Sequence, residues 1–350
     1  MKKEVFLGFL FCMSLTTVFA QPTLVQKQID SLVNAKAIPG IIIGTVDQGK
    51  QKIYTAGYAN VEQQTPFLPD TQLEIGSISK TFTAYILESI LLKKGLSDTL
   101  LIIDFLPDSI RSNTALGKIQ FLHLLNHTSG FPRLPSNLGT SANALLPYEG
   151  YNLNKLFSYL VTATPNPVGK VEYSNLGMGL AGVLAERISG KSYESLLKKY
   201  ISKPFRLKYT SLKTATFQPI ATGYFNSQNA LYWDMYALNG AGGIKSNTSE
   251  MLSYLNYLLM QSSNPIITSI TTPTATINKQ IKVAKGWHLL SSKEQSKIIW
   301  HNGGTYGFST FCAFNIETGK AVFLAINAFN KNKIADGLGF EIIMKMLTTK

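Results

Sequence analysis

The sequence predicts a mixed α+β fold in which an antiparallel sheet, flanked by helices, is built from the N- and C-terminal segments, with a mainly helical lobe inserted between them. Two observations predict this arrangement. Segments with strand character occur at both ends of the chain, and the stretch between them shows helical periodicity and short loops. A sheet that collects both chain ends can bury its faces against helices, and a cleft between two such lobes is a natural place for a site.

The first sheet segment is a predicted hairpin. Residues 39–61, PGIIIGTVDQGKQKIYTAGYANV, form two strand patterns joined by a turn at residues 47–49. A polar loop follows to Asp70. From Ile78 to Leu92 the apolar residues then recur at helical spacing, which predicts a helix.

The helical lobe is expected to cover roughly residues 80–225, where short helices and loops predominate. Clear helical patterns run from Gly177 to Ile188, just before Gly190, and from Tyr193 to Tyr200.

Strand character returns from Gly286 onward. The predicted strands are GWHLL (286–290), KIIWH (297–301), GFSTFCAFN (307–315) and KAVFLAINA (320–328), separated by turns such as residues 317–319. A last helix is predicted from about Ile334 to Leu347.

The first twenty residues have the pattern of a secretory signal peptide. Lys2 and Lys3 precede an apolar run from Val5 to Val18, and a small-residue cleavage site stands before Gln21. The run is shorter than the roughly 20 residues that span a bilayer. We therefore expect signal peptide 1–20 to be removed, leaving a single domain, 21–350, that is periplasmic or secreted and has no membrane span.

Composition limits the possible partners. After signal removal Cys312 is the only cysteine, so no internal disulfide is expected. The chain carries a net charge of +13, but its lysines are dispersed, without a basic run, zinc-finger spacing or aromatic RNA-binding motif. We expect no nucleic-acid partner, and we attribute the charge first to solubility and second to attraction toward anionic envelope polymers.

The segment EIGSISKTFTAYIL, residues 74–87, carries the strongest chemical signal. It places Ser77 and Lys80 three residues apart at the start of a predicted helix, where both side chains point to the same side. Alone the spacing is weak evidence, because it recurs at Ser195 and Lys198 and because serine is a preferred helix cap.

Two further motifs support a site. Tyr173-Ser174-Asn175 begins a predicted helix about one hundred residues later. His301-Asn302-Gly303, the only His-x-Gly of the chain, ends a predicted strand and is followed by Gly304. Glycines at such a place let a sheet edge approach a ligand closely.

With these motifs the chain resembles the serine β-lactamase and DD-peptidase superfamily, specifically its class C branch with related esterases and D-peptidases. The resemblance covers nearly the whole mature chain. Three additional landmarks occur in the family's order, namely LLNHTSGFP (124–132), KPFRLKYTS (203–211) and GAGGIKSNTSEM (240–251). Their joint order is more specific than any single match.

The resemblance implies an acyl-enzyme mechanism. A serine hydroxyl is a weak nucleophile that needs a neighbouring base. In this family Ser77 would attack, and Lys80 and Tyr173 would share the base role, each lowering the proton affinity of the other. The backbone N–H groups of Ser77 and Gly304 would bind the oxyanion.

The resemblance also implies the substrate contacts. Asn175 would hydrogen-bond the substrate amide and Lys80, and His301 and Gly303 would help to position the substrate. Class C β-lactamases carry Lys-Thr-Gly at the third motif, a sequence that this chain lacks, and they prefer an aromatic residue where this chain has Leu73. Histidine is mostly neutral at pH 7 and is a poorer anchor for a carboxylate than lysine.

Other site types are less well supported. His123 and His127 are four residues apart, which would suit two metal ligands, but the zinc-protease pattern fails, and we expect both rings to pack or brace a loop. Gly-x-Ser-x-Gly and the Walker phosphate-binding pattern are absent, and no cofactor is expected. The aromatic residues of YEGYN (148–152) either line the cleft or pack within their loop.

The expected function is that of an exported, cofactor-free serine acyl-hydrolase acting on a small-molecule or peptide substrate. D-Ala-ended peptides, β-lactams and esters are the expected substrates, and a DD-peptidase is favoured. A true class C β-lactamase, an esterase, and a protein that binds or senses penicillin without turnover remain alternatives.

Overall fold

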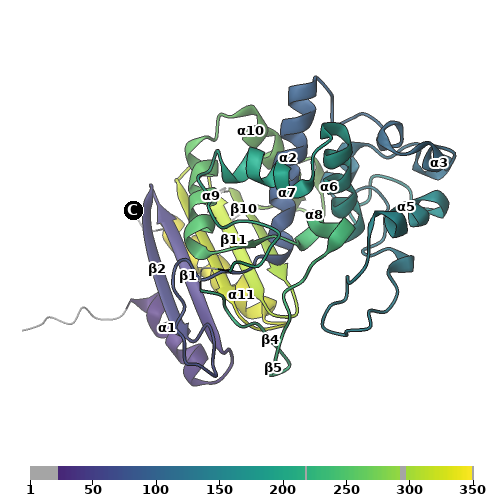
Figure 1. The fold of residues 1–350 in the computed structure, drawn as a ribbon. Coiled ribbons are helices and arrows are strands. Elements are labelled where there is room, and N and C mark those ends of the chain that lie inside the picture. The colour runs from purple at the N-terminus through teal and green to yellow at the C-terminus, as the bar shows by residue number, and fades with distance from the viewer. Residues whose placement is uncertain (1–22, 217–218, 292–296, 349–350) are drawn as a thin grey trace, which may run out of the picture.

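An antiparallel sheet of eight strands forms the centre of the computed structural model, which describes residues 23–216, 219–291 and 297–348 (Figure 1). The strands are β1 (Gly40–Asp47), β2 (Lys50–Gly57), β7 (Ala275–Thr276), β8 (Ile281–Val283), β9 (His288–Ser291), β10 (Lys297–Gly304), β11 (Ser309–Asn315) and β12 (Lys320–Ile326). Their order is β2-β1-β12-β11-β10-β9-β8-β7. The N-terminal hairpin pairs with a C-terminal strand, with Ile41 opposite Ile326. The predicted α+β class and the sheet built from both chain ends are therefore confirmed.

Helices cover both faces of this sheet. Helices α1 (Leu24–Asn34) and α11 (Asn332–Thr348) lie on one face, and α2 (Ser79–Lys94) and α9 (Thr248–Met260) lie on the side of the helical segment (Figure 1). Neighbouring residues of β12 divide between the two layers: Leu324 packs in the α11 cluster, whereas Phe323 and Ala325 pack in the larger core. This alternation explains why the strand is hydrophobic from Ala321 to Ile326, since neither face meets water.

Helix α2 is the axis of the helical side. Its residues are buried on nearly every side, from Ser79 to Leu91, as expected for a helix that is enclosed by protein. It is in contact with α6 (Asn175–Ser189), α8 (Asn239–Gly242) and α10 (Pro265–Thr271). The remaining helices are short and lie farther out: α3 (Asp108–Arg111), α4 (Phe121–Leu125), α5 (Leu153–Thr162) and α7 (Tyr193–Leu197). Two small sheets, β3 (Leu73–Glu74) with β6 (Lys245–Ser246) and β4 (Tyr224–Phe225) with β5 (Gln228–Asn229), complete the architecture.

Local sequence signals explain the best-predicted elements. The hairpin turn between β1 and β2 uses Gln48 (φ 47°) and Gly49 (φ 85°), two positive angles that suit the twist of the strands. The predicted helix 78–92 is α2, which ends at Gly95 in the left-handed conformation.

Other elements differ from the predicted ones. The pattern at 193–200 is α7 followed by a π-helical turn at Lys198–Ser202. Helices α1, α5, α9 and α10 and strands β7 and β8 were not predicted. The two strands are two and three residues long, too short for a strand pattern to be visible.

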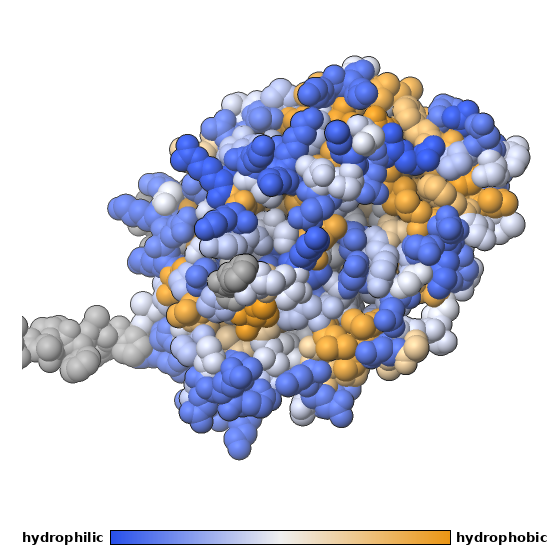
Figure 2. All heavy atoms as spheres, viewed as in Figure 1, coloured by the Kyte–Doolittle hydropathy of each residue, from blue (hydrophilic) through white to orange (hydrophobic). Residues whose placement is uncertain are grey.

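The polarity of the surface and any membrane-spanning segments are relevant to the predicted export of the protein. Figure 2 shows hydrophilic residues spread over the visible face, with smaller hydrophobic areas between them. Among the described residues, no helix has the length and apolar character needed to cross a bilayer. The predicted signal peptide 1–20 lies outside the described residues.

Candidate active site

Ser77 lies in a 3-10 turn, Gly76–Ile78 (η1), that leads directly into α2. Gly76 has a φ of +53°, and a β-carbon there would lie 2.7 Å from the backbone nitrogen of Gly304. A β-carbon at Gly303 would lie 2.1 Å from the carbonyl oxygen of Ile75. The end of β10 therefore packs against the serine turn so closely that only glycine fits at these positions.

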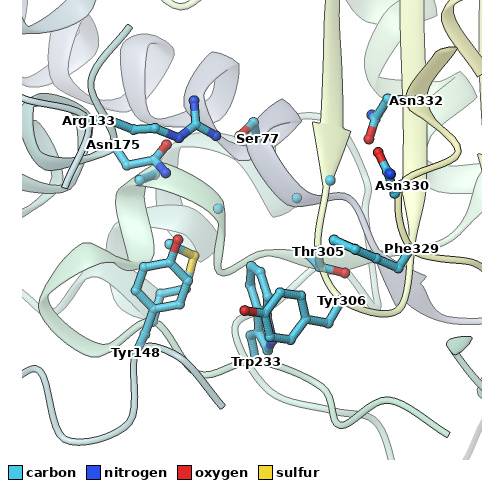
Figure 3. Close-up of a pocket in the computed structure, with 15 residues that line it drawn as sticks. Ser77, Arg133, Tyr148, Asn175, Trp233, Thr305, Tyr306, Phe329, Asn330 and Asn332 are labelled. Atoms are coloured by element: carbon cyan, nitrogen blue, oxygen red, sulfur yellow. The ribbon is translucent and has the colours of Figure 1, made fainter. Parts of the chain in front are cut away.

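A pocket of about 270 Å³ opens above this turn (Figure 3). Figure 3 places Arg133 and Asn175 on one side of Ser77 and Asn330 and Asn332 on the other. Aromatic rings form another wall. The lining residues are Gly76, Ser77, Arg133, Tyr148, Asn175, Trp233, Met235, Ala241, Gly242, Gly304, Thr305, Tyr306, Phe329, Asn330 and Asn332.

Lys80 is fully buried beneath Ser77. Its Nζ donates to Ser77 Oγ at 2.9 Å and to the carbonyl oxygen of Ala241 at 2.5 Å. None of the ion pairs among the described residues includes Lys80. Burial lowers the pKa of Lys80 well below the ordinary lysine value of 10.5, and the nearby Arg133 charge lowers it further. The amine can therefore be neutral and accept the serine proton.

Tyr173 directly precedes the helix α6, and the Lys80 Nζ lies 4.9 Å from the centroid of its ring. Burial raises the pKa of Tyr173 to about 12, although a hydrogen bond to Ser77 and the Arg133 charge lower it. The expected mutual lowering with Lys80 is thus wrong for the tyrosine, because desolvation of its hydroxyl outweighs the neighbouring charge. The pKa of Tyr173 is thus raised, whereas that of Lys80 is lowered.

Asn175 is the first residue of α6 and lines the pocket. Its backbone nitrogen donates to the Arg133 carbonyl oxygen at 2.9 Å, which places the side chain. The expected hydrogen bond to Lys80 is not formed, since the lysine donates to Ser77 and Ala241. The buried Asn175 Oδ1 has no hydrogen-bond partner. An unpaired acceptor at a pocket wall is available to bind a ligand.

His301 does not line the pocket, contrary to the expectation of a substrate contact. It is buried behind Tyr173, with ring centroids 6.3 Å apart, and 5.2 Å from the ring of His288. Burial lowers the pKa of His301 well below 6.5, and the charge nearby on Lys80 contributes. A neutral, enclosed imidazole cannot anchor a carboxylate in the pocket.

Alternation along β10 explains the positions of the third motif. Asn302 points to the opposite side, where its Nδ2 donates to Asp336 of α11 at 2.8 Å. Gly303 does not line the pocket either, and its carbonyl oxygen accepts from Asn332 Nδ2 at 2.7 Å. Gly304 does line it.

The two other histidines singled out in the sequence have structural contacts. His123 Nδ1 accepts from the Gln120 backbone nitrogen at 3.2 Å and caps α4. His127 Nδ1 accepts from the Ser174 backbone nitrogen at 3.2 Å, and its ring packs on Tyr173. The described part of the chain contains no group of three or more potential metal ligands.

Sequence reasoning missed several residues of the pocket. Arg133 lies with its guanidinium carbon 5.1 Å from the centroid of the Tyr173 ring. The only signal for it was its place directly after the landmark 124–132. Trp233 was also missed: its backbone nitrogen donates to the buried Glu74 at 2.5 Å, and Thr305 donates to the other oxygen of that carboxyl group at 2.7 Å. Glu74 thereby links two walls of the pocket.

Comparison with known proteins identifies the family. The β-lactamase family model matches residues 25–342. The chain is 27% identical over 293 residues to a β-lactamase of Providencia stuartii, covering 81% of this chain and 67% of the relative. It is 26% identical over 302 residues to penicillin-binding protein 4* of Bacillus subtilis, covering 78% of this chain and 64% of that protein.

The fold agrees with solved structures. A class C β-lactamase from Rhodobacter sphaeroides superposes with a TM-score of 0.79 at 21% identity, covering 93% of this chain and 99% of the other. The matched segments span 56 to 67% of the length of the β-lactamases compared by sequence. By its family match and its fold, the chain belongs to the β-lactamase family of serine hydrolases.

Proposed function

We propose that the protein is an exported serine acyl-hydrolase that forms an acyl-enzyme on Ser77, with D-Ala-ended peptides as its preferred substrates. The observation that carries the proposal is the buried Lys80 amine, 2.9 Å from Ser77 Oγ and without a carboxylate partner among the described residues. A structural helix cap would not require a lysine to be buried at this cost.

The geometry supports a proton path for acylation. Neutral Lys80 accepts the Ser77 proton while Oγ bonds to the substrate carbonyl carbon. The backbone N–H groups of Ser77 and Gly304 stabilise the oxyanion. As the intermediate collapses, the bond to the leaving group breaks. Tyr173 gives its hydroxyl proton to the leaving group and takes the proton that Lys80 holds. Water then attacks the ester, and the same groups move its proton.

Two named relatives represent the substrate classes in question. One is a β-lactamase and the other a penicillin-binding protein. A DD-peptidase is favoured over efficient β-lactam turnover because the third motif lacks lysine and His301 is enclosed. The predicted signal peptide 1–20 supports export to the periplasm or beyond. Class C β-lactamase activity remains the alternative, favoured by the first relative.

The test uses mature protein, residues 21–350, and a fluorescent penicillin. Intact mass and drug loss are followed for the native enzyme and for Ser77→Ala. A lasting adduct that Ser77→Ala cannot form supports the peptidase, because slow deacylation traps penicillin. Fast drug loss without an adduct supports the β-lactamase alternative. If neither occurs, a chromogenic ester tests for acyl transfer to Ser77. Equal activity of Ser77→Ala on every compound would overturn the mechanism.

A further inference from the structure

The pocket contains one formal charge. Among its lining residues, Arg133 is the only one whose side chain is ionised at neutral pH, and no aspartate or glutamate lines the pocket. The other polar groups there are hydroxyls, amides and backbone atoms. A substrate entering this pocket therefore meets a single cation.

The Arg133 guanidinium is also free of acidic partners. The ion pairs of the described residues join other side chains, so no carboxylate there neutralises it. The side chain is exposed, and its guanidinium lies over the Tyr173 ring. The backbone of Arg133 is fixed, because its carbonyl oxygen accepts from the backbone nitrogens of Asn175 and Leu176 at 2.9 and 3.2 Å. A solvent-accessible guanidinium fork on a fixed backbone is well suited to two parallel hydrogen bonds with a carboxylate.

The position of Arg133 indicates which part of the substrate it would contact. In the proton path above, Tyr173 delivers its proton to the leaving group. The Arg133 guanidinium carbon is 5.1 Å from the centroid of that tyrosine ring, so a leaving group that receives the Tyr173 proton would lie close to Arg133. The residue expected to occupy the anchoring position from the third motif, His301, is buried and cannot reach a substrate.

We propose that Arg133 is the carboxylate anchor of this enzyme and makes it selective for acyl substrates whose leaving group carries a carboxylate. Peptides that end in a free D-amino acid have such a leaving group, and so do the bicyclic β-lactams. The proposal rests on the proposed serine acyl-hydrolase function, and it assigns to Arg133 a specificity role that His301 cannot fill.

The experiment compares two esters of the same acylglycine, one with a 3-carboxyphenyl and one with an unsubstituted phenyl leaving group. kcat/KM is measured for both with the native enzyme and with Arg133→Met, which keeps an unbranched aliphatic stem but removes the charge and the hydrogen-bond donors. Hydrogen bonds to a charged group commonly contribute about 10- to 100-fold. We expect the ratio of kcat/KM for the carboxylated over the neutral ester to fall by that factor. Arg133→Lys, which keeps the charge but not the fork, should give an intermediate ratio.

Arg187→Met is the matched control. Arg187 is likewise exposed and lies over an aromatic ring, 5.8 Å from the centroid of Phe157, but it does not line the pocket. Its substitution should leave the ratio unchanged. If Arg133→Met slows both esters equally, the residue acts on structure or on Lys80, and the anchor proposal is wrong while the hydrolase stands. If Ser77→Ala hydrolyses both esters as the native enzyme does, the proposed function itself fails.

Discussion

Two buried lysines have completely different surroundings. Lys80 belongs to helix α2, and Lys285 packs against the same helix. Lys80, in the first turn, donates to a serine hydroxyl and a carbonyl oxygen. Lys285, beside the second half of the helix, contacts Glu88 at 2.8 Å and Asp98 at 2.6 Å, and it donates to Ser269 at 2.7 Å. Both side chains are almost wholly enclosed.

The difference shows that the partners of a buried lysine, rather than burial alone, decide its role. At Lys285 two carboxylates offset the cost of removing an ammonium ion from water. Lys80 has two hydrogen bonds but no carboxylate partner among the described residues, and burial lowers its pKa well below the ordinary value. The first arrangement ties α2 to the segment that precedes β9, and the second is the proposed base next to the proposed nucleophile. Two similar side chains, one belonging to α2 and one packed against it, thus have different partners and different proposed roles.

The largest expected effect is the loss of activity in Lys80→Met. Removing the base should lower kcat/KM by about 10²- to 10⁴-fold, the usual contribution of general base catalysis. The free energy of unfolding should stay the same or increase, because an unpaired amine leaves the core. Steady-state kinetics on a chromogenic ester and urea unfolding test both parts. Retained activity together with a lower free energy of unfolding would show that Lys80 has a structural role rather than a catalytic one.

Lys285→Met should produce the opposite result. It leaves the buried Glu88 and the half-buried Asp98 close to each other without a cation, which we expect to cost about 3 kcal/mol of unfolding free energy. The residue does not line the pocket, so kcat/KM of the folded fraction should remain close to native. Urea unfolding and kinetics at 20 °C check this, with Lys80→Met as the matched lysine substitution. A cost below about 1 kcal/mol, as for a surface ion pair, would show that the pair contributes little.

The smallest expected effect is a pH dependence of stability, which tests whether the Lys80 amine is neutral in the folded protein. Its folded-state pKa lies below the ordinary value of 10.5, so between the two values the unfolded chain binds more protons than the folded one. The stability of the native protein should therefore rise with pH in this window, by at most about 1.4 kcal/mol per pH unit.

Lys80→Met lacks this contribution. Its gain in unfolding free energy over the native protein should be largest at low pH and should vanish as the pH approaches 10.5. Urea unfolding of both proteins from pH 7 to pH 10 measures the difference. A difference that is constant over this range would mean that Lys80 is charged in the folded state.

The sequence by itself determined the features that depend on local geometry. Ser77 and Lys80 meet because residues three apart share one side of a helix, and the turn at Gln48 and Gly49 forms because its residues tolerate positive φ angles. Segments with strand character at both ends of the chain also predicted a sheet assembled from both chain ends. Each of these follows from short stretches of chain.

The tertiary structure decided the chemistry. The pKa of Lys80 is lowered because residues distant in sequence enclose it and bring Ala241 and Arg133 to its side, with no ion-pair partner among the described residues. His301 is enclosed because the end of β10 presses on the serine turn and directs the ring behind Tyr173, a register that spacing in the sequence does not reveal. Arg133 faces the pocket because its carbonyl oxygen holds the start of α6. Proton affinities depend on desolvation and on charges across the fold, and these exist only once the chain has packed.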